Sequence, residues 1–126
     1  MDHQIEIIYS GELRTSSKHL FSNSSIITDA PLDNKGKGEA FSPTDLVASA
    51  LGSCMMTIMA IAADTQNINI EGSTATIKKI MGEDPRRIAE IHLDFTFVKP
   101  LGQKHRIVLE RAAHNCPVSK SLHPNL

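Results

Sequence analysis

Residues 42–63 read SPTDLVASALGSCMMTIMAIAA, and this stretch decides the fold. Its opening residues are typical of a helix start, because Ser42 can act as the N-cap, Pro43 suits the first helical position and Asp45 lies near the positive end of the helix. The 18 residues that follow are all apolar or small, and none of them is charged. We therefore predict one long helix from Pro43 to about Asp64.

This predicted helix is apolar on every side, which is typical of a membrane span or of a buried central helix. Its apolar stripe is formed by Val47, Leu51, Cys54, Ile58 and Ile61. The length only just reaches the transmembrane threshold, the segment is rich in alanine, acids flank both ends and no aromatic belt is present. We therefore expect a buried central helix and no membrane span.

The chain has 126 residues, which fits a single domain, 1–126. A domain of this size could hardly cover such a helix completely, so we expect a second copy of the chain to cover one face and form a homodimer. The net charge is −1, from 13 basic and 14 acidic residues, and there is no Trp and only one Tyr. This composition argues against a nucleic-acid partner and against an anionic membrane surface.

The chain begins with polar and acidic residues, which is not the pattern of a secretory signal peptide. We therefore expect a cytoplasmic protein, in which thiols are kept reduced at rest. Its two cysteines are Cys54 and Cys116. In a reducing compartment a pair of cysteines is more often catalytic, redox-sensing or simply buried than a structural disulfide.

The remaining segments predict an α+β fold with antiparallel sheets. Strands are expected at 4–10, 13–21 and 24–28, followed by a loop at 33–38 that is rich in turn residues. The segments 68–81 and 87–98 alternate between apolar and polar residues and predict an antiparallel hairpin, with a turn at 82–85 between them. Helices are expected at 103–114 and 117–122.

Composition alone favours a buried, inert Cys54, because free cysteine is among the most buried residue types. A reactive cysteine needs a nearby cation or a helix N-terminus to stabilise its thiolate. Cys54 lies about 12 residues into the predicted helix, too far for the N-terminal dipole, so a cation would have to come from elsewhere in the fold. Arg14, Lys18 and His19 share one predicted strand, in which Arg14 taken by itself would be a solvated charge at a sheet edge.

Cys116 precedes Pro117 at a predicted helix start, where the free N–H groups of the first turn favour a thiolate. His114 and Lys120 are close in sequence and would add positive charge. A zinc site formed by Cys54, Cys116, His114 and His123 has none of the usual ligand spacings, so we expect no metal.

The two cysteine segments together resemble those of one protein family. Residues 42–54, SPTDLVASALGSC, resemble the segment that leads into the first cysteine of the OsmC/Ohr (osmotically inducible protein C-like) thiol peroxidases, and residues 116–122, CPVSKSL, resemble the segment around their second cysteine. Arg14 lies where these proteins carry an arginine on an early strand. The predicted order of elements is similar as well, although many relatives continue into a further strand beyond the position of Leu126.

The resemblance implies an α+β OsmC-like fold in which two chains intertwine around their central helices, with two active sites at the dimer interface. It implies that Cys54 attacks a hydroperoxide, that Cys116 forms a disulfide with the resulting sulfenic acid, and that an external dithiol reduces this disulfide. An arginine, here Arg14, would stabilise the thiolate, and a glutamate would orient that arginine. The family glutamate is replaced by Thr44 in this chain, so Asp45 or Glu39 would take its role.

We therefore predict a thiol-dependent peroxidase that reduces organic hydroperoxides without a metal or an organic cofactor. The catalytic residues would be Cys54, Cys116, Arg14 and Asp45. Position 44 lies about 15 Å from Cys54 along a straight helix, so the helix start would serve the partner subunit's site. Two other classes stay open, namely a dimeric protein that binds an apolar ligand and a cysteine-dependent hydrolase that recruits His19, His92 or His114.

Overall fold

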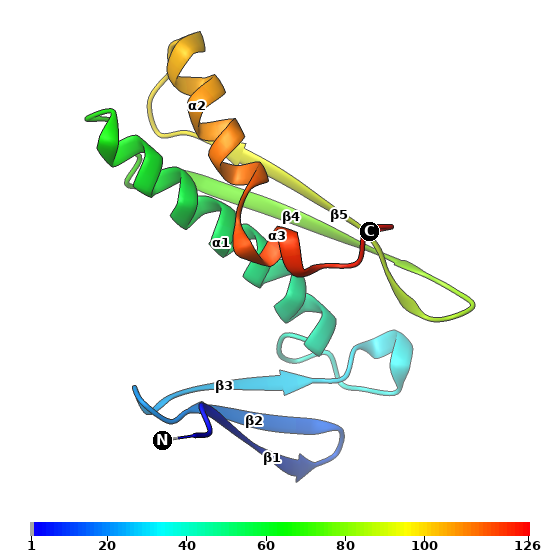
Figure 1. The fold of residues 1–126 in the computed structure, drawn as a ribbon. Coiled ribbons are helices and arrows are strands. Elements are labelled where there is room, and N and C mark those ends of the chain that lie inside the picture. The colour runs from blue at the N-terminus through cyan, green and yellow to red at the C-terminus, as the bar shows by residue number, and fades with distance from the viewer. Residues whose placement is uncertain (1) are drawn as a thin grey trace. The chain divides into compact units, whose positions relative to one another are not determined.

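A computed structural model describes residues 2–126 (Figure 1). The strands β1 (Ile5–Gly11), β2 (Arg14–His19) and β3 (Ser24–Asp29) come first, followed by the 3-10 helix η1 (Leu32–Asn34) and the long helix α1 (Pro43–Thr65). The strands β4 (Thr74–Gly82) and β5 (Arg87–Thr96) and the helices α2 (Gln103–His114) and α3 (Pro117–Ser121) complete the chain. The predicted α+β class with antiparallel sheets and a long helix is confirmed.

The chain divides into two compact units, residues 1–46 and 47–126. In the first unit β1, β2 and β3 form an antiparallel sheet in that order. Within residues 2–46 only Thr28, Asp29 and Ser42 are buried. The large apolar side chains of this unit are exposed, among them Ile7, Ile8, Tyr9, Phe21, Ile26 and Ile27. This sheet therefore has no apolar core of its own.

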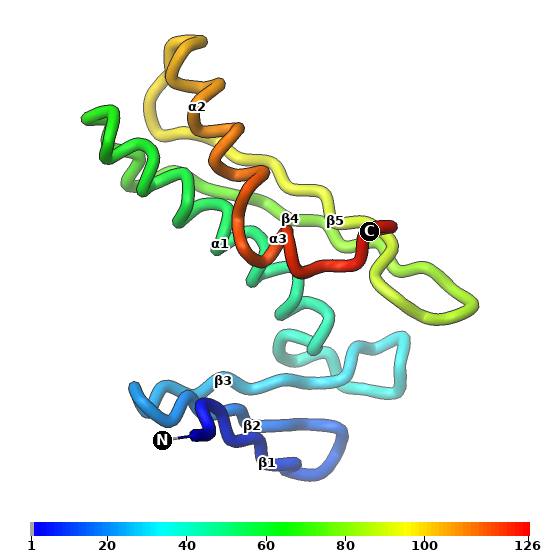
Figure 2. The backbone as a smooth tube through the Cα atoms, viewed as in Figure 1, coloured from blue at the N-terminus to red at the C-terminus, as the bar shows by residue number. Residues whose placement is uncertain are grey.

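The second unit contains the apolar core. Its buried cluster consists of Met59 and Ala63 on α1, Ile70 in the following loop, and Leu109 and Ala113 on α2. The tube in Figure 2 follows α1, the β4–β5 hairpin and α2 in this part of the chain. These contacts fix α2 on α1, so the segment that follows α2 is held by a packed helix pair.

Close packing of α1 on the hairpin depends on a glycine. A Cβ atom added at Gly52 would lie 2.5 Å from the Cδ1 atom of Ile77 on β4. The face that α1 buries within this chain is formed by Ala48, Leu51, Gly52, Met59 and Ala63. It includes only one residue of the stripe that the apolar spacing indicated, because small side chains allow a closer approach than the larger ones do.

The opposite face of α1 remains open in the single chain. Ile61 of the predicted stripe is 57% exposed, and Ala50, Ser53 and Thr57 are also exposed. By length and composition α1 would pass as a membrane span, with a mean hydropathy of 2.0, but the core helix of a soluble protein passes the same test. The expectation of a buried central helix is thus met on one face only.

Most element bounds agree with the predictions, and α2 matches its predicted range at both ends. The clearest difference is the predicted strand 68–81, because β4 begins only at Thr74. The Asn69 side chain accepts the N–H of Glu71 at 2.8 Å, and Gly72 has a φ of +92°. This local turn interrupts the alternating pattern before pairing with β5 starts.

Candidate active site

Cys54 lies in the middle of α1 and is partly exposed. The residue is a free thiol, and it follows Ser53 on the open face of the helix. No helix terminus is near it, as the sequence predicted, so a cation is still required if its thiolate is to be stabilised. Cys54 is therefore the more exposed of the two cysteines.

Cys116 lies at the joint between α2 and α3 and is fully buried, with 0% of its surface exposed. It is the N-cap residue of α3, and its Sγ atom accepts the backbone N–H of Ser119 at 3.3 Å. Pro117 occupies the first turn. The predicted helix-start environment of Cys116 is confirmed.

Cys54 and Cys116 both belong to the second unit, residues 47–126. Met55 and Met59 of α1 line the same cavity as Ala113 and His114 at the end of α2. The turn of α1 that begins at Met55, beside Cys54, therefore lies across this cavity from the end of α2. That helix ends at His114, two residues before Cys116. Long-range packing has brought together two segments that are far apart in the sequence.

This cavity has a volume of about 510 Å³ and lies between α1, β5 and α2. Its floor is apolar and is formed by Met55, Met59, Ile91, Leu93, Phe95, Phe97 and Ala113. Its polar groups come from Asp94, Arg106, Glu110 and His114. The Arg106 Nε atom donates to Glu110 at 3.0 Å, one turn along α2. Such a lining suits a ligand with an apolar body and a polar end.

Arg14 pairs with an acid other than Asp45 or Glu39. It lies directly opposite Asp29 in the β2–β3 register, and its Nη2 atom lies 3.2 Å from Asp29 Oδ2. The same oxygen accepts the backbone N–H of Glu39 at 2.9 Å. The Glu39 N–H and the Arg14 guanidinium together hold the pKa of Asp29 below its ordinary value of 3.8, against the opposing effect of burial.

The two acids proposed to orient Arg14 have other contacts. Asp45 Oδ2 accepts the backbone N–H of Ser42 at 3.0 Å, and Ser42 Oγ accepts the N–H of Asp45 at 3.0 Å. This reciprocal cap starts α1. Glu39 reaches the pair only through its backbone. The carboxylate beside Arg14 in this chain is therefore Asp29, which the antiparallel register could have indicated once β2 and β3 were aligned.

The histidines required by the hydrolase alternative are dispersed. His19 shares a hydrogen bond of 2.7 Å with Ser22, and His92 lies 3.2 Å from Glu90, both at exposed positions. His114 lines the cavity beside Met55. Among residues 2–126, no three His, Cys, Asp or Glu side chains are grouped so that they could hold a metal ion.

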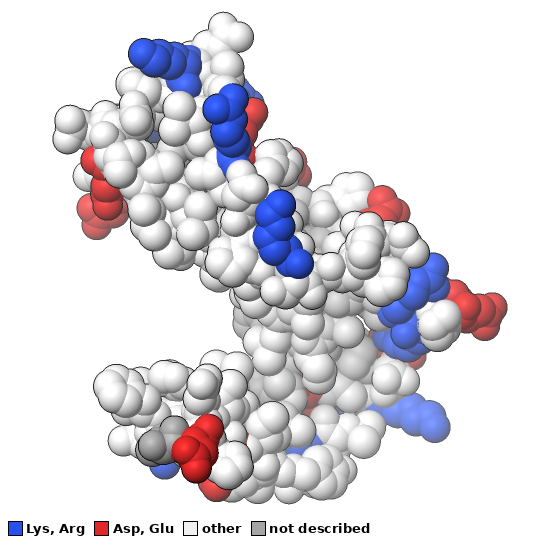
Figure 3. All heavy atoms as spheres, in the orientation of Figure 1, with Lys and Arg blue, Asp and Glu red and all other residues white. Residues whose placement is uncertain are grey.

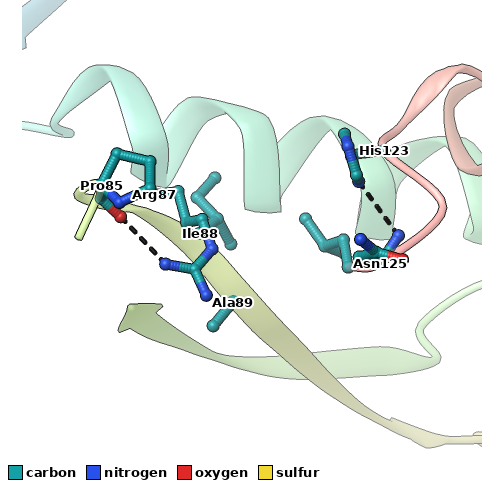
Figure 4. Close-up of a pocket in the computed structure, with 7 residues that line it drawn as sticks. Pro85, Arg87, Ile88, Ala89, His123 and Asn125 are labelled. Atoms are coloured by element: carbon teal, nitrogen blue, oxygen red, sulfur yellow. Dashed lines mark hydrogen bonds between the residues drawn. The ribbon is translucent and has the colours of Figure 1, made fainter. Parts of the chain in front are cut away.

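A second cavity, of about 430 Å³, lies between the start of β5 and the C-terminal segment (Figure 4). The Arg87 Nη1 atom donates to the backbone oxygens of Glu83 and Pro85 at 2.7 and 2.9 Å. His123 Nδ1 accepts the N–H of Asn125 at 3.0 Å. The Arg87 and His123 side chains are thus engaged with backbone atoms, and neither cysteine lines this cavity.

Comparison with known proteins identifies the family of this chain. The family model for OsmC-like proteins matches residues 36–126, the larger part of the chain. The chain belongs to the OsmC-like protein family. The resemblance carried by the two cysteine segments is confirmed, and so is the OsmC-like fold.

Several solved structures of other proteins are similar to this chain in sequence and in fold. A protein from Psychrobacter arcticus 273-4, provisionally described as an osmotic stress induced and detoxification response protein, is 51% identical, with a TM-score of 0.95 over 98% of this chain and 90% of that one. An organic hydroperoxide resistance protein from Legionella pneumophila is 17% identical, with a TM-score of 0.75 over 96% and 88%.

A further organic hydroperoxide resistance protein, from Elizabethkingia anophelis, is 17% identical, with a TM-score of 0.74 over 99% of this chain and 91% of that one. At this identity the two hydroperoxide resistance proteins show a shared fold. No curated protein sequence matches the chain.

Proposed function

We propose that this OsmC-like protein is a thiol-dependent peroxidase that reduces organic hydroperoxides. The observation that carries the proposal is the contrast between its two free cysteines. Cys54 is accessible on α1, whereas Cys116 is buried at a helix start with its sulfur bound to an N–H group. The first suits a thiol that meets a substrate, and the second suits a thiol that reacts only with a neighbouring sulfur.

In the proposed reaction the Cys54 thiolate attacks the distal oxygen of the hydroperoxide. The O–O bond breaks, an alcohol leaves with a proton, and Cys54 becomes a sulfenic acid. The Cys116 thiolate then attacks the Cys54 sulfur, a disulfide forms and water leaves after protonation of the hydroxide. An external dithiol reduces the disulfide by exchange, in keeping with a cytoplasmic location.

Arg14 is the proposed cation for the Cys54 thiolate. Its guanidinium is charged at every working pH, and a close positive charge favours the ionised thiol. Lys18 on the same strand is the rival cation, and it is exposed. Asp45 caps the start of α1, and we propose that this helix start contributes to the active site of the partner subunit.

The apolar residues close to Cys54 favour an organic peroxide over hydrogen peroxide. Met55 lines the cavity between α1, β5 and α2, and Met56 is partly exposed on the next position of the helix. Leu51, one turn earlier, is buried. A bulky alkyl or aryl group would lie against the methionine side chains, which adapt to irregular shapes.

We also propose that the protein is a homodimer. The open face of α1 around Ile61 and the apolar residues of the N-terminal sheet need cover that the single chain does not supply. Charged side chains of both signs are scattered over the face shown in Figure 3, with wide uncharged areas between them. A second copy of the chain would supply matching apolar surface.

Sedimentation tests the dimer. The wild-type chain should sediment as one species at twice the chain mass across the micromolar range. Ile61→Asp should yield a monomer or aggregate, because an unpaired charge buried in an apolar interface costs several kcal/mol, roughly. Lys104→Asp, at an exposed position of α2, is the matched charge control and should leave the dimer intact. A folded monomeric wild type would contradict the proposal.

Thiol titration tests the peroxidase. One equivalent of cumene hydroperoxide should consume both thiols of each chain, and mass analysis should show the loss of two hydrogens. A dithiol should restore both thiols and permit further turnover. If both cysteines still react with a maleimide after excess peroxide, the protein is not a thiol peroxidase of this kind.

The cavity of about 510 Å³ supports a second candidate, the binding of an apolar ligand without turnover. A medium-chain fatty acid is the probe, because its chain would occupy the apolar floor and its carboxylate could reach Arg106 or His114. Under this candidate the probe binds equally well to wild type and Cys54→Ser and more weakly to Phe97→Ala. Binding without any thiol loss on peroxide treatment would favour it over the peroxidase.

A further inference from the structure

The half-buried ion pair of Arg14 and Asp29 in the N-terminal sheet would affect Cys54 if Arg14 stabilises its thiolate. Arg14 and Asp29 are direct partners across β2 and β3, so both side chains lie on the same face of the sheet. The Asp29 side chain is 0% exposed and that of Arg14 is 37% exposed. The carboxylate is thus the fixed, buried member of the pair, and the guanidinium extends from it toward the surface.

Asp29 is held in place from several directions. Its Oδ2 atom accepts the N–H of Glu39 at 2.9 Å, and its own backbone N–H donates to the carbonyl of Phe41 at 2.9 Å. The neighbouring Ala30 accepts the N–H of Gly38 at 3.1 Å. These contacts fasten the loop that follows η1 to the end of β3, so the carboxylate position is set by the backbone.

The second carboxylate oxygen is the unusual feature. Asp29 Oδ1 is buried and has no hydrogen-bond partner among the described residues 2–126. An ionised carboxylate can accept two N–H groups of one guanidinium in a bidentate arrangement. Arg14 uses one of these two oxygens, so Asp29 offers a second acceptor on which the guanidinium can turn while it stays attached.

We propose that Asp29 is the positioning residue that aims Arg14, in place of the family glutamate whose position is occupied by Thr44. This inference rests on the proposed function, in which Arg14 stabilises the Cys54 thiolate. The nearby pair of Lys37 and Glu12, 3.0 Å apart, is exposed and screened by solvent, so it is a weak competitor for either member.

Asp29 has to be ionised to act in this way, and its surroundings favour that. The Glu39 N–H lowers the pKa of Asp29, burial raises it, and the Arg14 and Lys37 charges lower it further. Of the charged side chains on the adjoining β-turn and loop, Glu12 is bound to Lys37 and Glu39 contributes its backbone. Above the acidic range the carboxylate is therefore charged and can hold Arg14.

The test is the rate of Cys54 alkylation as a function of pH in Asp29→Asn, in a Cys116→Ser background. Loss of positioning predicts that the half-maximal pH of alkylation rises by about half a unit or more, since the cation no longer lies close to the thiolate. The rate of reaction with cumene hydroperoxide should fall about tenfold, because misplaced groups lose orientation. Asp29→Glu should restore part of both losses.

Other roles for Asp29 predict other outcomes. If its charge acted only at a distance, its removal would favour the thiolate and lower the half-maximal pH. If Asp29 only stabilised the sheet, the variant would melt earlier and the alkylation profile would not move. Either result would overturn the proposal. Glu39→Pro, which removes one donor to the carboxylate and keeps Asp29, gives a second variant if Asp29→Asn does not fold, and a smaller upward shift is expected.

A matched control comes from the adjacent register pair. Thr15 and Thr28 lie opposite each other and share a side-chain hydrogen bond on the other face of the same two strands. Thr28→Val should weaken the sheet without moving the alkylation profile.

Arg14→Ala distinguishes failure of the proposed role of Arg14 from failure of the positioning role of Asp29. If Arg14→Ala leaves the alkylation profile unchanged, the proposed role of Arg14 fails. If it shifts the profile and Asp29→Asn does not, only the positioning role fails. When both proposals hold, Asp29→Asn has no further effect in an Arg14→Ala background.

Discussion

The two cysteines occupy opposite kinds of surroundings. Cys54 lies in the middle of the 23-residue helix α1, far from either end and partly exposed. Cys116 lies outside any helix interior, fully buried, and caps the five-residue helix α3 with its sulfur. Cys54, in the middle of a helix, has no free backbone N–H group close to its sulfur, whereas the sulfur of Cys116 accepts the N–H of Ser119.

This difference assigns the order of events in the proposed reaction. A substrate from solution can approach Cys54, whose thiolate depends on an imported cation. Cys116 has a ready N–H donor for its thiolate but no exposed surface, so a sulfenic acid on a neighbouring segment is the electrophile that suits it. The two serine substitutions should therefore affect different steps: Cys54→Ser the reaction with peroxide, and Cys116→Ser the resolution of the sulfenic acid.

The largest expected effect is that of Cys54→Ser. It removes the only thiol with exposed surface, so peroxide consumption should fall to the rate of the buffer control. Stopped-flow measurement with cumene hydroperoxide in the presence of a dithiol gives the rate, and circular dichroism verifies that the fold is unchanged. Residual turnover through Cys116 would break the assignment of roles.

A smaller effect is expected from Cys116→Ser. Cys54 should still consume about one equivalent of peroxide, but turnover should stop because no thiol resolves the sulfenic acid. A dimedone adduct on Cys54 would trap the sulfenic acid, and excess peroxide should convert it to sulfinic acid. Sustained turnover of this variant with a dithiol would show that the reductant attacks Cys54 directly.

Sequence patterns predicted the local features around both cysteines. The start of α1 and the helix start at Cys116 were readable because capping residues and proline act within one turn. The face that α1 buries was not, because a helix without charges gives no polar side from which to orient it. Gly52 decides that face through its contact with Ile77, a residue that only the folded chain brings near.

The acid that pairs with Arg14 was likewise not predictable from local sequence patterns. The acids expected to orient Arg14 were Asp45 and Glu39, which lie at or near the start of α1 in the sequence. Asp29 lies 15 positions from Arg14, and only the β2–β3 register places the two residues opposite each other. Strand pairing is a non-local property, so no local pattern indicated this carboxylate.

A third prediction concerns stability and sharpens the contrast at Cys116. In Cys116→Ser the hydroxyl oxygen can replace Sγ as acceptor for the Ser119 N–H, whereas Cys116→Ala leaves that donor without its cap. The serine variant should therefore be the more stable of the two by about 1 kcal/mol, the usual worth of an N-cap. Chemical denaturation of both reduced variants measures the difference. Equal stabilities would mean that the cap contributes nothing to α3.

The smallest expected effect is confined to one amide. In the reduced protein the Ser119 N–H donates to Cys116 Sγ at 3.3 Å. When Cys116 joins Cys54, its sulfur becomes part of a neutral disulfide, a weaker acceptor, so we expect this hydrogen bond to weaken or break. Hydrogen exchange at Ser119 should then become several-fold faster in the oxidised protein, roughly as expected for loss of about 1 kcal/mol of protection. Exchange at Leu109, in the packed middle of α2, should change little because its contacts do not involve the sulfur. Unchanged exchange at Ser119 in a fully oxidised sample would mean that Cys116 reaches its partner without leaving the cap, and the resolving thiol would then be as preorganised as the structure of the reduced chain shows it.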